Sequence, residues 1–150
     1  LFSMACDLSL AACELSLMNA KALKLEEYIE IENTDFLTWS SRLLDKKIKF
    51  DFIVSNPPYI PSAEISFLQP EVQAYEDIRA LDGGAEGFDL IKDIIIETAK
   101  LLKPGGTLWL ETDSRQLPMI NEFIASRDFR MLRKFNDLRG VCRFCCLQYN

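Results

Sequence analysis

The sequence predicts an α/β protein with a mostly parallel sheet, helices on both faces and a C-terminal pair of antiparallel strands. Three observations predict this class. Short apolar runs of strand length alternate with helix-length segments along residues 1–127, and such alternation gives parallel strands joined by helices. Residues 129–149 hold two strand-like runs joined by a short polar turn, which predicts antiparallel neighbours. Polar residues directly follow the first three strand-like runs, where open α/β sheets bind ligands.

The first two strands and helices are predicted from hydrophobic periodicity. Phe2–Cys6 is an apolar run that ends at Asp7, and the apolar residues of Ser9–Leu25 recur close to the helical period. Tyr28–Glu32 alternates apolar and acidic residues, as a strand does. Leu37–Lys49 is polar and is predicted to contain a short helix.

The third strand, Phe50–Ser55, is followed by a long irregular segment. Ile60–Gly87 carries two prolines and three glycines, and a connection of this length is typically functional or disordered. Its apolar residues favour an ordered binding loop. Gly83-Gly84-x-x-Gly87 does not follow a strand and lacks a Lys-Ser/Thr pair, so it is interpreted as turn glycines and not as a phosphate loop.

The remaining chain is predicted to form a helix, a strand, a helix and two closing strands. The predicted elements span Phe88–Lys103, Thr107–Glu111, Pro118–Arg127, Phe129–Phe135 and Val141–Tyr149. Pro104-Gly105-Gly106 ends the first of these helices, and Pro118 suits the first turn of the second.

Composition excludes several classes of site. The chain has 150 residues, enough for one domain with a real core, and a formal net charge of −6. This charge argues against a broad phosphate-binding surface, so no direct nucleic-acid binding is expected. The absence of histidine removes Ser-His and Cys-His nucleophilic sites and histidine metal ligands. Residues 1–20 contain Asp7 and Glu14 without a basic leader, which indicates neither a signal peptide nor a membrane span.

The cysteines indicate an intracellular protein with reduced thiols. There are five, an odd number without regular spacing, at Cys6, Cys13, Cys142, Cys145 and Cys146. Cys142-x-x-Cys145 lies in a predicted strand, where side chains three residues apart point to opposite faces. No second pair exists, so no metal site is predicted.

Asn56-Pro57-Pro58-Tyr59 is the strongest candidate for a functional site. The two prolines lack N–H groups and disfavour helix at the residues before them, so Asn56 and Pro57 are held extended past the strand. The Asn56 side-chain oxygen and the Pro57 carbonyl can accept the two hydrogens of a planar amide or aniline-type nitrogen, with the Tyr59 ring beside them. Such a cradle aims the nitrogen lone pair at an electrophile without a strong base. The alternative is a proline-stiffened loop with a capping asparagine.

Several of these residues together resemble a known family. Polar residues follow the strands at Asp7, at Asp35-Phe36 and at Asn56–Tyr59, and Leu101–Gly106 precedes the fourth strand. This arrangement resembles the class I S-adenosylmethionine-dependent methyltransferases, and the Asn-Pro-Pro-Tyr form marks those that methylate planar nitrogens.

The long loop narrows the resemblance to the HemK/PrmC family of release-factor glutamine N5-methyltransferases. The similar segments are Ser55–Ile60, Leu68–Val72, Tyr75-Glu76 and Ala80–Gly87. The resemblance implies methyl transfer from S-adenosyl-L-methionine to the glutamine N5 amide in the Gly-Gly-Gln motif of peptide-chain release factors. The release factor is therefore the expected partner.

The resemblance also implies cofactor-binding roles. Asp7 would bind the ribose hydroxyls, Asp35 would accept from the adenine amine, and Phe36 would cover the adenine ring. Their structural alternatives are a helix-cap aspartate for Asp7 and an Asx-turn with an adjacent core aromatic for Asp35 and Phe36.

The implied catalytic residues are Asn56, Pro57 and Tyr59. Asn56 would bind the glutamine amide beside the methionine end of the cofactor, and Pro57, Pro58 and Tyr59 would complete the substrate site. Glu71 and Glu76 are assigned either to shaping the loop and contacting the release factor or to a solvated surface.

The family has further parts that this sequence lacks. They are an N-terminal helical domain, an earlier strand and a glycine-rich turn around the cofactor's methionine end. In this fold the absent strand lies between those ending at Asp7 and Ser55. Residues 1–150 are therefore interpreted as the C-terminal part of a single catalytic domain with its first strand missing.

Two other functions stay open beside glutamine methylation. One is adenine N6 methylation on nucleic acid, against which the acidic charge and the loop pattern weigh. The other is a non-catalytic, truncated methyltransferase-like module. The expected location is intracellular, in the mitochondrion of a eukaryote and otherwise in the cytoplasm, with no membrane association.

Overall fold

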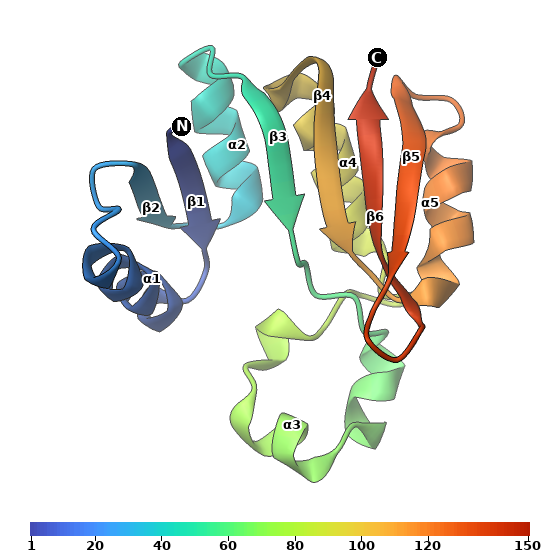
Figure 1. The fold of residues 1–150 in the computed structure, drawn as a ribbon. Helices are drawn as coiled ribbons and strands as arrows, with labels where there is room; N and C mark the ends of the chain where they lie inside the picture. Colours follow the sequence, from blue (N-terminus) through green and yellow to red (C-terminus); the bar gives the residue numbers. More distant parts are fainter. The chain divides into compact units, whose positions relative to one another are not determined.

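The computed structural model describes all of residues 1–150, and the chain forms two compact units, residues 1–48 and residues 49–150. Each unit has its own sheet, with strand order β1-β2 in the first and β3-β4-β6-β5 in the second (Figure 1). The α/β class, with parallel strands followed by a closing antiparallel pair, is confirmed. The strands form two hydrogen-bonded sheets and not one, with β1 and β3 at the ends of their sheets. None of the helices is both long and apolar enough to span a bilayer.

The first unit is a parallel strand pair with two helices. Its elements are β1 Ser3–Asp7, α1 Leu10–Ala22, β2 Ile29–Asn33 and α2 Phe36–Asp45. Asp7 lies opposite Asn33 in the parallel register, so both strands end at the same edge. The Ser9 side chain caps α1 and the Asp35 side chain caps α2, each by accepting a backbone N–H of the first turn.

The second unit is a four-stranded mixed sheet with two long helices. Its strands and long helices are β3 Phe50–Ser55, α4 Asp89–Leu101, β4 Leu102–Glu111, α5 Leu117–Ile124, β5 Phe129–Asn136 and β6 Cys142–Tyr149. β3 pairs with β4 in parallel, whereas β6 is antiparallel to both β4 and β5. The predicted turn between the closing strands is confirmed.

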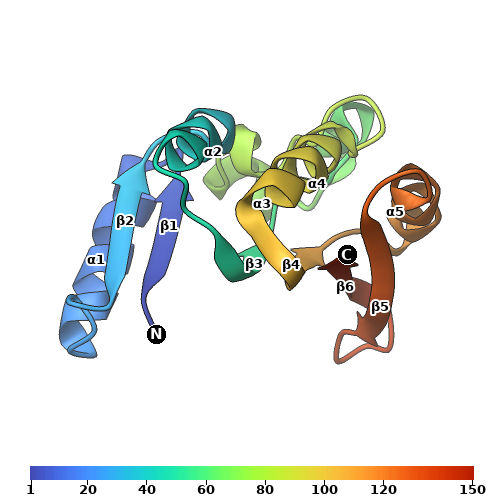
Figure 2. The same cartoon turned by 90° about the horizontal axis from the view of Figure 1, so that it is seen from above.

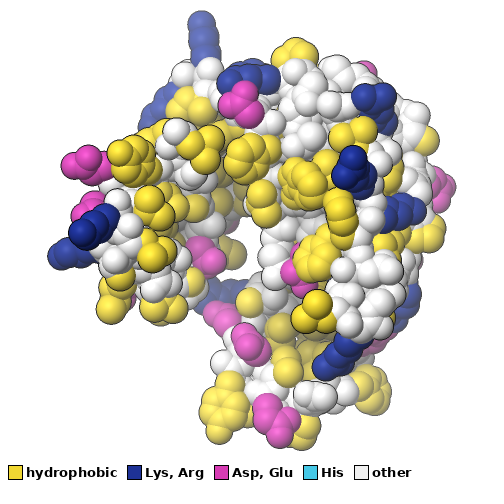
Figure 3. Space-filling view, in the orientation of Figure 1, with side chains coloured by type: hydrophobic (Ala, Val, Ile, Leu, Met, Phe, Trp, Pro, Cys, Tyr) yellow, Lys and Arg dark blue, Asp and Glu magenta, His cyan; other side chains and the backbone are white.

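The sheet of this unit is covered by helices on one face. Figure 2 shows α4 and α5 on the same side of it. The strand residues beneath them are at most 1% exposed and are Leu108, Leu110, Cys145 and Leu147. The other face exposes large apolar side chains, among them Val54 at 68% and Trp109 at 37%. Figure 3 shows hydrophobic side chains gathered over this face, so the expected two-sided cover is not formed inside residues 49–150.

The predicted boundary between α4 and β4 was wrong. The helix predicted over Phe88–Lys103 ends at Leu101, and β4 begins at Leu102 instead of Thr107. Residues 103–106 bulge from the ladder, because Phe50 pairs with Leu102 but Phe52 already pairs with Thr107. Gly105, at a φ of +80°, supplies the left-handed backbone that this bulge requires.

Residues 60–87, called the arm, contain three short helices. They are η1 Ser62–Phe67, α3 Pro70–Tyr75 and η2 Ile78–Ala80, drawn in green below the sheet in Figure 1. The arm closes on itself where Ile60 donates to the Leu81 carbonyl at 3.0 Å and accepts from the Gly83 N–H at 2.9 Å. The expected long connection is therefore an ordered loop with a closed neck.

Candidate active site

The turn Asn56–Tyr59 leaves the carboxyl end of β3 without helix or strand structure. Ser55, the last strand residue, pairs with Leu110 of β4, so the turn begins at the carboxyl edge of the parallel pair. Pro57 is buried, whereas the side chain of Asn56 is exposed. The predicted placement of this turn just beyond the third strand is confirmed, and it is the edge at which open α/β sheets hold ligands.

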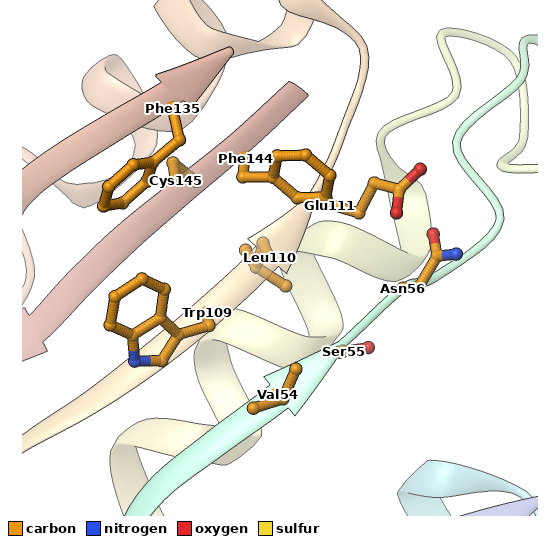
Figure 4. A pocket seen from close by; sticks show the side chains of 9 residues that line it. All are labelled: Val54, Ser55, Asn56, Trp109, Leu110, Glu111, Phe135, Phe144 and Cys145. Carbon is orange, nitrogen blue, oxygen red and sulfur yellow. The ribbon is translucent and has the colours of Figure 1, made fainter. Parts of the chain in front are cut away.

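The Asn56 amide opens onto a pocket of about 310 Å³ on the exposed face of the sheet. Figure 4 shows Asn56 and Glu111 at one end of this pocket. Its apolar wall includes Val54, Trp109, Phe135 and Phe144. The Asn56 side chain has no hydrogen-bond partner within the chain. Its oxygen and nitrogen are therefore available to a ligand.

Tyr59 is held by side chains from two strands. Its hydroxyl donates to Glu111 Oε1 at 3.2 Å and accepts from Arg143 Nη1 at 3.3 Å. Arg143 in turn forms an ion pair with Asp137 at 3.5 Å. Burial, followed by the negative charge of Glu111, raises the pKa of Tyr59, so this phenol is protonated at neutral pH. The network fixes the orientation of the ring beside Asn56.

Gln116 contacts the turn through its side-chain amide. It closes the short helix η3, Ser114–Gln116, and its side-chain amide donates to the Tyr59 carbonyl at 2.8 Å and the Gly87 carbonyl at 2.6 Å. Gln116, Glu111 and Arg143 were not predicted from the sequence. A local signal existed for one of them, because Asp113-x-x-Gln116 has the spacing of a capping box, and the structure contains that box.

The predicted cofactor residues lie together in the first unit. Asp7 follows β1, and Asp35 and Phe36 follow β2, at the common carboxyl edge of the two strands. Asp7 Oδ1 accepts from Ser9 N at 2.7 Å, and Asp35 Oδ1 accepts from Thr38 N at 2.9 Å. A hydrogen bond from the Thr38 side chain, followed by the one from its backbone N–H, lowers the pKa of Asp35. A carboxylate offers about four acceptor sites, so Asp7 and Asp35 keep capacity for a ligand hydroxyl or amine beside these local bonds.

The half-buried Cys6 thiol beside these carboxylates has an altered pKa. Burial first, and then the charges of Asp7, Glu32 and Asp35, raise the pKa of Cys6 to about 12. Cys6 is thus a neutral packing residue and not a nucleophile. No cluster of three or more histidine, cysteine or acidic side chains that could hold a metal ion is present.

Comparison with known proteins gives a consistent set of relatives. Residues 7–139 match the family model described as Eco57I restriction-modification methylase. The chain is 36% identical over 137 residues to a release factor glutamine methyltransferase from Clostridium acetobutylicum, covering 91% of this chain and 47% of that protein. It is 38% identical over 132 residues to the human MTRF1L release factor glutamine methyltransferase, covering 88% of this chain and 39% of that protein. The chain thus spans less than half the length of these curated relatives.

Solved structures support the fold. The SAH complex of SMU.776 superimposes with a TM-score of 0.70 at 11% identity, over 99% of this chain and 39% of that one. The O-methyltransferase from Bacillus cereus, also in complex with SAH, gives a TM-score of 0.64 at 12% identity, over 98% of this chain and 62% of that one. At these identities the likeness establishes a class I methyltransferase fold.

Proposed function

Because the chain matches the Eco57I methylase family model and belongs with the release factor glutamine methyltransferases, we propose that the whole protein methylates a release factor. The acceptor is the N5 amide nitrogen of the glutamine in a Gly-Gly-Gln motif, and the methyl donor is S-adenosyl-L-methionine. The observation that carries this proposal is the unpartnered Asn56 amide beside Pro57 at the carboxyl edge of a parallel strand pair.

The first unit fits the nucleoside part of the donor. Two carboxylates with remaining acceptor capacity stand at one sheet edge, and a carboxylate accepts well from ribose hydroxyls or an exocyclic amine. We assign Asp7 to the ribose and Asp35 to the adenine amine, with the half-buried Phe36 against the ring. The donor, when bound, supplies an electrophilic methyl group.

The second unit provides a cradle for the acceptor. The Asn56 side-chain oxygen accepts one N–H of the glutamine amide, and the Pro57 carbonyl accepts the other. With both hydrogens held, the nitrogen lone pair is directed away from its own carbonyl plane, which is positioning catalysis. Glu111, at the same end of the pocket, favours the positive charge that develops on the nitrogen (Figure 4). The amide proton leaves after the N–C bond has formed, so no strong base is needed.

Adenine N6 methylation is the second candidate, because the matching family model is named for a restriction-modification methylase. Both acceptors are planar N–H₂ groups and suit the same cradle. The net charge of −6 disfavours a nucleic-acid substrate, since binding a duplex requires neutralisation of several phosphates. With a release factor as acceptor, we propose that the protein acts where translation terminates, in the mitochondrion of a eukaryote and otherwise in the cytoplasm.

The test is an assay of the whole protein with two acceptors. Release factor and DNA are incubated separately with enzyme and S-adenosyl-L-methionine, and the products are analysed by mass spectrometry. We expect one added methyl on the Gly-Gly-Gln glutamine and none on DNA. A release factor carrying asparagine at that position is the matched control. Methyl groups found only on adenines would reject the assignment, and transfer to neither acceptor would favour a non-catalytic module.

A further inference from the structure

The Asn56–Tyr59 turn cannot hold its own shape by backbone hydrogen bonds. Pro57 and Pro58 have no N–H, so two of its four residues donate nothing. The proposed cradle uses the Pro57 carbonyl. The direction of this carbonyl therefore depends on the hydrogen bonds and packing contacts of the neighbouring residues. On its C-terminal side the turn is held by the next residue, Ile60, whose N–H donates to the Leu81 carbonyl at 3.0 Å.

The Gln116 side chain supplies further hydrogen bonds to the turn, and its amide has a defined orientation. Its Oε1 accepts from the Thr112 hydroxyl at 2.6 Å and from the Asp113 N–H at 3.1 Å. A backbone N–H can only donate, so the atom facing Asp113 must be the oxygen. The nitrogen then donates mainly to two carbonyls, those of Tyr59 at 2.8 Å and Gly87 at 2.6 Å, with a longer bond to the Glu86 carbonyl at 3.4 Å. The side chain is only 3% exposed, so water does not compete for these bonds.

Two glycines let the backbone of the turn come close enough to accept the hydrogen bond from Gln116. A Cβ at Gly83 would lie 2.8 Å from both the Pro58 carbonyl oxygen and the Tyr59 Cα. A Cβ at Gly87 would lie 2.1 Å from the Tyr59 carbonyl oxygen and 2.7 Å from Gln116 Nε2. The backbone of Pro58 and Tyr59 thus packs against bare glycine backbone. The Gly83-Gly84-x-x-Gly87 spacing therefore has a packing reason beyond the turn itself.

We propose that Gln116 is a positioning residue for methyl transfer. By donating to both the Tyr59 and the Gly87 carbonyl, its side chain holds the turn against Gly83 and Gly87 and so sets the direction of the Pro57 carbonyl. This inference rests on the proposed function for its kinetic readout. Gln116 does not touch the acceptor, so its removal weakens transition-state geometry and leaves most of the release-factor contact area intact.

The experiment compares three variants of the whole protein. Gln116→Leu removes both donors, and Gln116→Glu keeps the shape while turning a carboxylate toward the two carbonyls. Ile120→Val, a fully buried residue of the following helix, is the control for a general loss of packing. We expect kcat to fall about 100-fold in both Gln116 variants, as a misplacement of roughly 1 Å does, while the KM for release factor stays within about threefold. The Ile120→Val protein should keep wild-type kcat.

A readout without any acceptor separates this inference from the proposed function. Amide hydrogen exchange should rise at Ile60 in Gln116→Leu by about tenfold or more, and should stay unchanged in β6. Wild-type protein that methylates no release factor would refute the proposed function alone, and the exchange data would still decide on Gln116. A folded Gln116→Leu protein with normal kcat, or with unchanged exchange at Ile60, overturns the proposal.

Discussion

Replacing Gly87 with alanine is expected to damage methyl transfer, because the new Cβ displaces the Tyr59 carbonyl of the turn. The new Cβ would lie 2.1 Å from the Tyr59 carbonyl oxygen, whereas ordinary van der Waals contact begins at 3.4 Å. The carbonyl must therefore retreat by about 1.3 Å, the difference between these distances. A shift of about 1 Å at a positioning element lowers turnover by roughly 100-fold. The same movement breaks the bond between Gln116 and Tyr59.

The backbone conformation adds a smaller term that a matched control isolates. Gly87 has a φ of +67°, which an alanine adopts at about 1–2 kcal/mol. Gly105 has a φ of +80° but nothing within 4 Å of its Cβ position, and it lies in the β4 bulge away from the site. Gly105→Ala therefore carries the conformational strain without the clash.

The assay is single-turnover methylation of release factor by the whole protein, with thermal unfolding measured on both variants. We expect a larger loss of stability in Gly87→Ala than in Gly105→Ala, because only the former adds the clash with the Tyr59 carbonyl, and a loss of turnover in Gly87→Ala alone. Equal turnover in the two variants would show that the close approach of Tyr59 to Gly87 has no bearing on the chemistry.

Three further predictions address single residues. Asn56→Ala should lower the single-turnover rate by about 10²–10³ with little change in release-factor affinity, because one preorganised polar contact is lost in the transition state; a near-normal rate would reduce the turn to a stiff loop. Asp7→Ala should weaken donor binding by about 1.5–3 kcal/mol in calorimetry, the range for charge-assisted bonds, and unchanged affinity would leave Asp7 with its local bond to Ser9 alone. Burial raises the pKa of Cys145 to about 12, so this thiol stays protonated at pH 8 and should resist iodoacetamide in the folded protein; rapid alkylation detected by peptide mass analysis would contradict that burial.

Much of the fold is readable from local pattern. Phe50–Ser55 was predicted with its observed bounds because an apolar run of strand length ends at two prolines. The end of α4 was not predicted, since Leu102 continues the helical period and leaves it only to pair with Phe50 of β3. The one-sided cover of the second sheet was also missed, because periodicity shows that a helix has an apolar face and not which side of a sheet receives it.

The candidate site was likewise predicted only in part from the sequence. Asn56 and Pro57 stand in one short motif, and Asp35 follows a strand directly, so local sequence locates them. The supports of Tyr59 come from Glu111, Gln116 and Arg143, which are 52, 57 and 84 residues away along the chain. Pairings at such separations depend on strand order and register, which no local pattern specifies.

The supports of the turn all belong to residues 49–150, whereas the carboxylates assigned to the donor belong to residues 1–48. If the assignment is correct, changes to Glu111, Gln116 or Arg143 should leave donor affinity unaltered. Changes to Asp7 or Asp35 should leave acceptor geometry unaltered. Distant sites without shared partners are additive in free energy, so a Gln116→Leu and Asp7→Ala pair should combine without coupling. A coupling free energy above about 0.5 kcal/mol in the double-mutant cycle would mean that both changes act on one element, and the separation of donor and acceptor roles would fail.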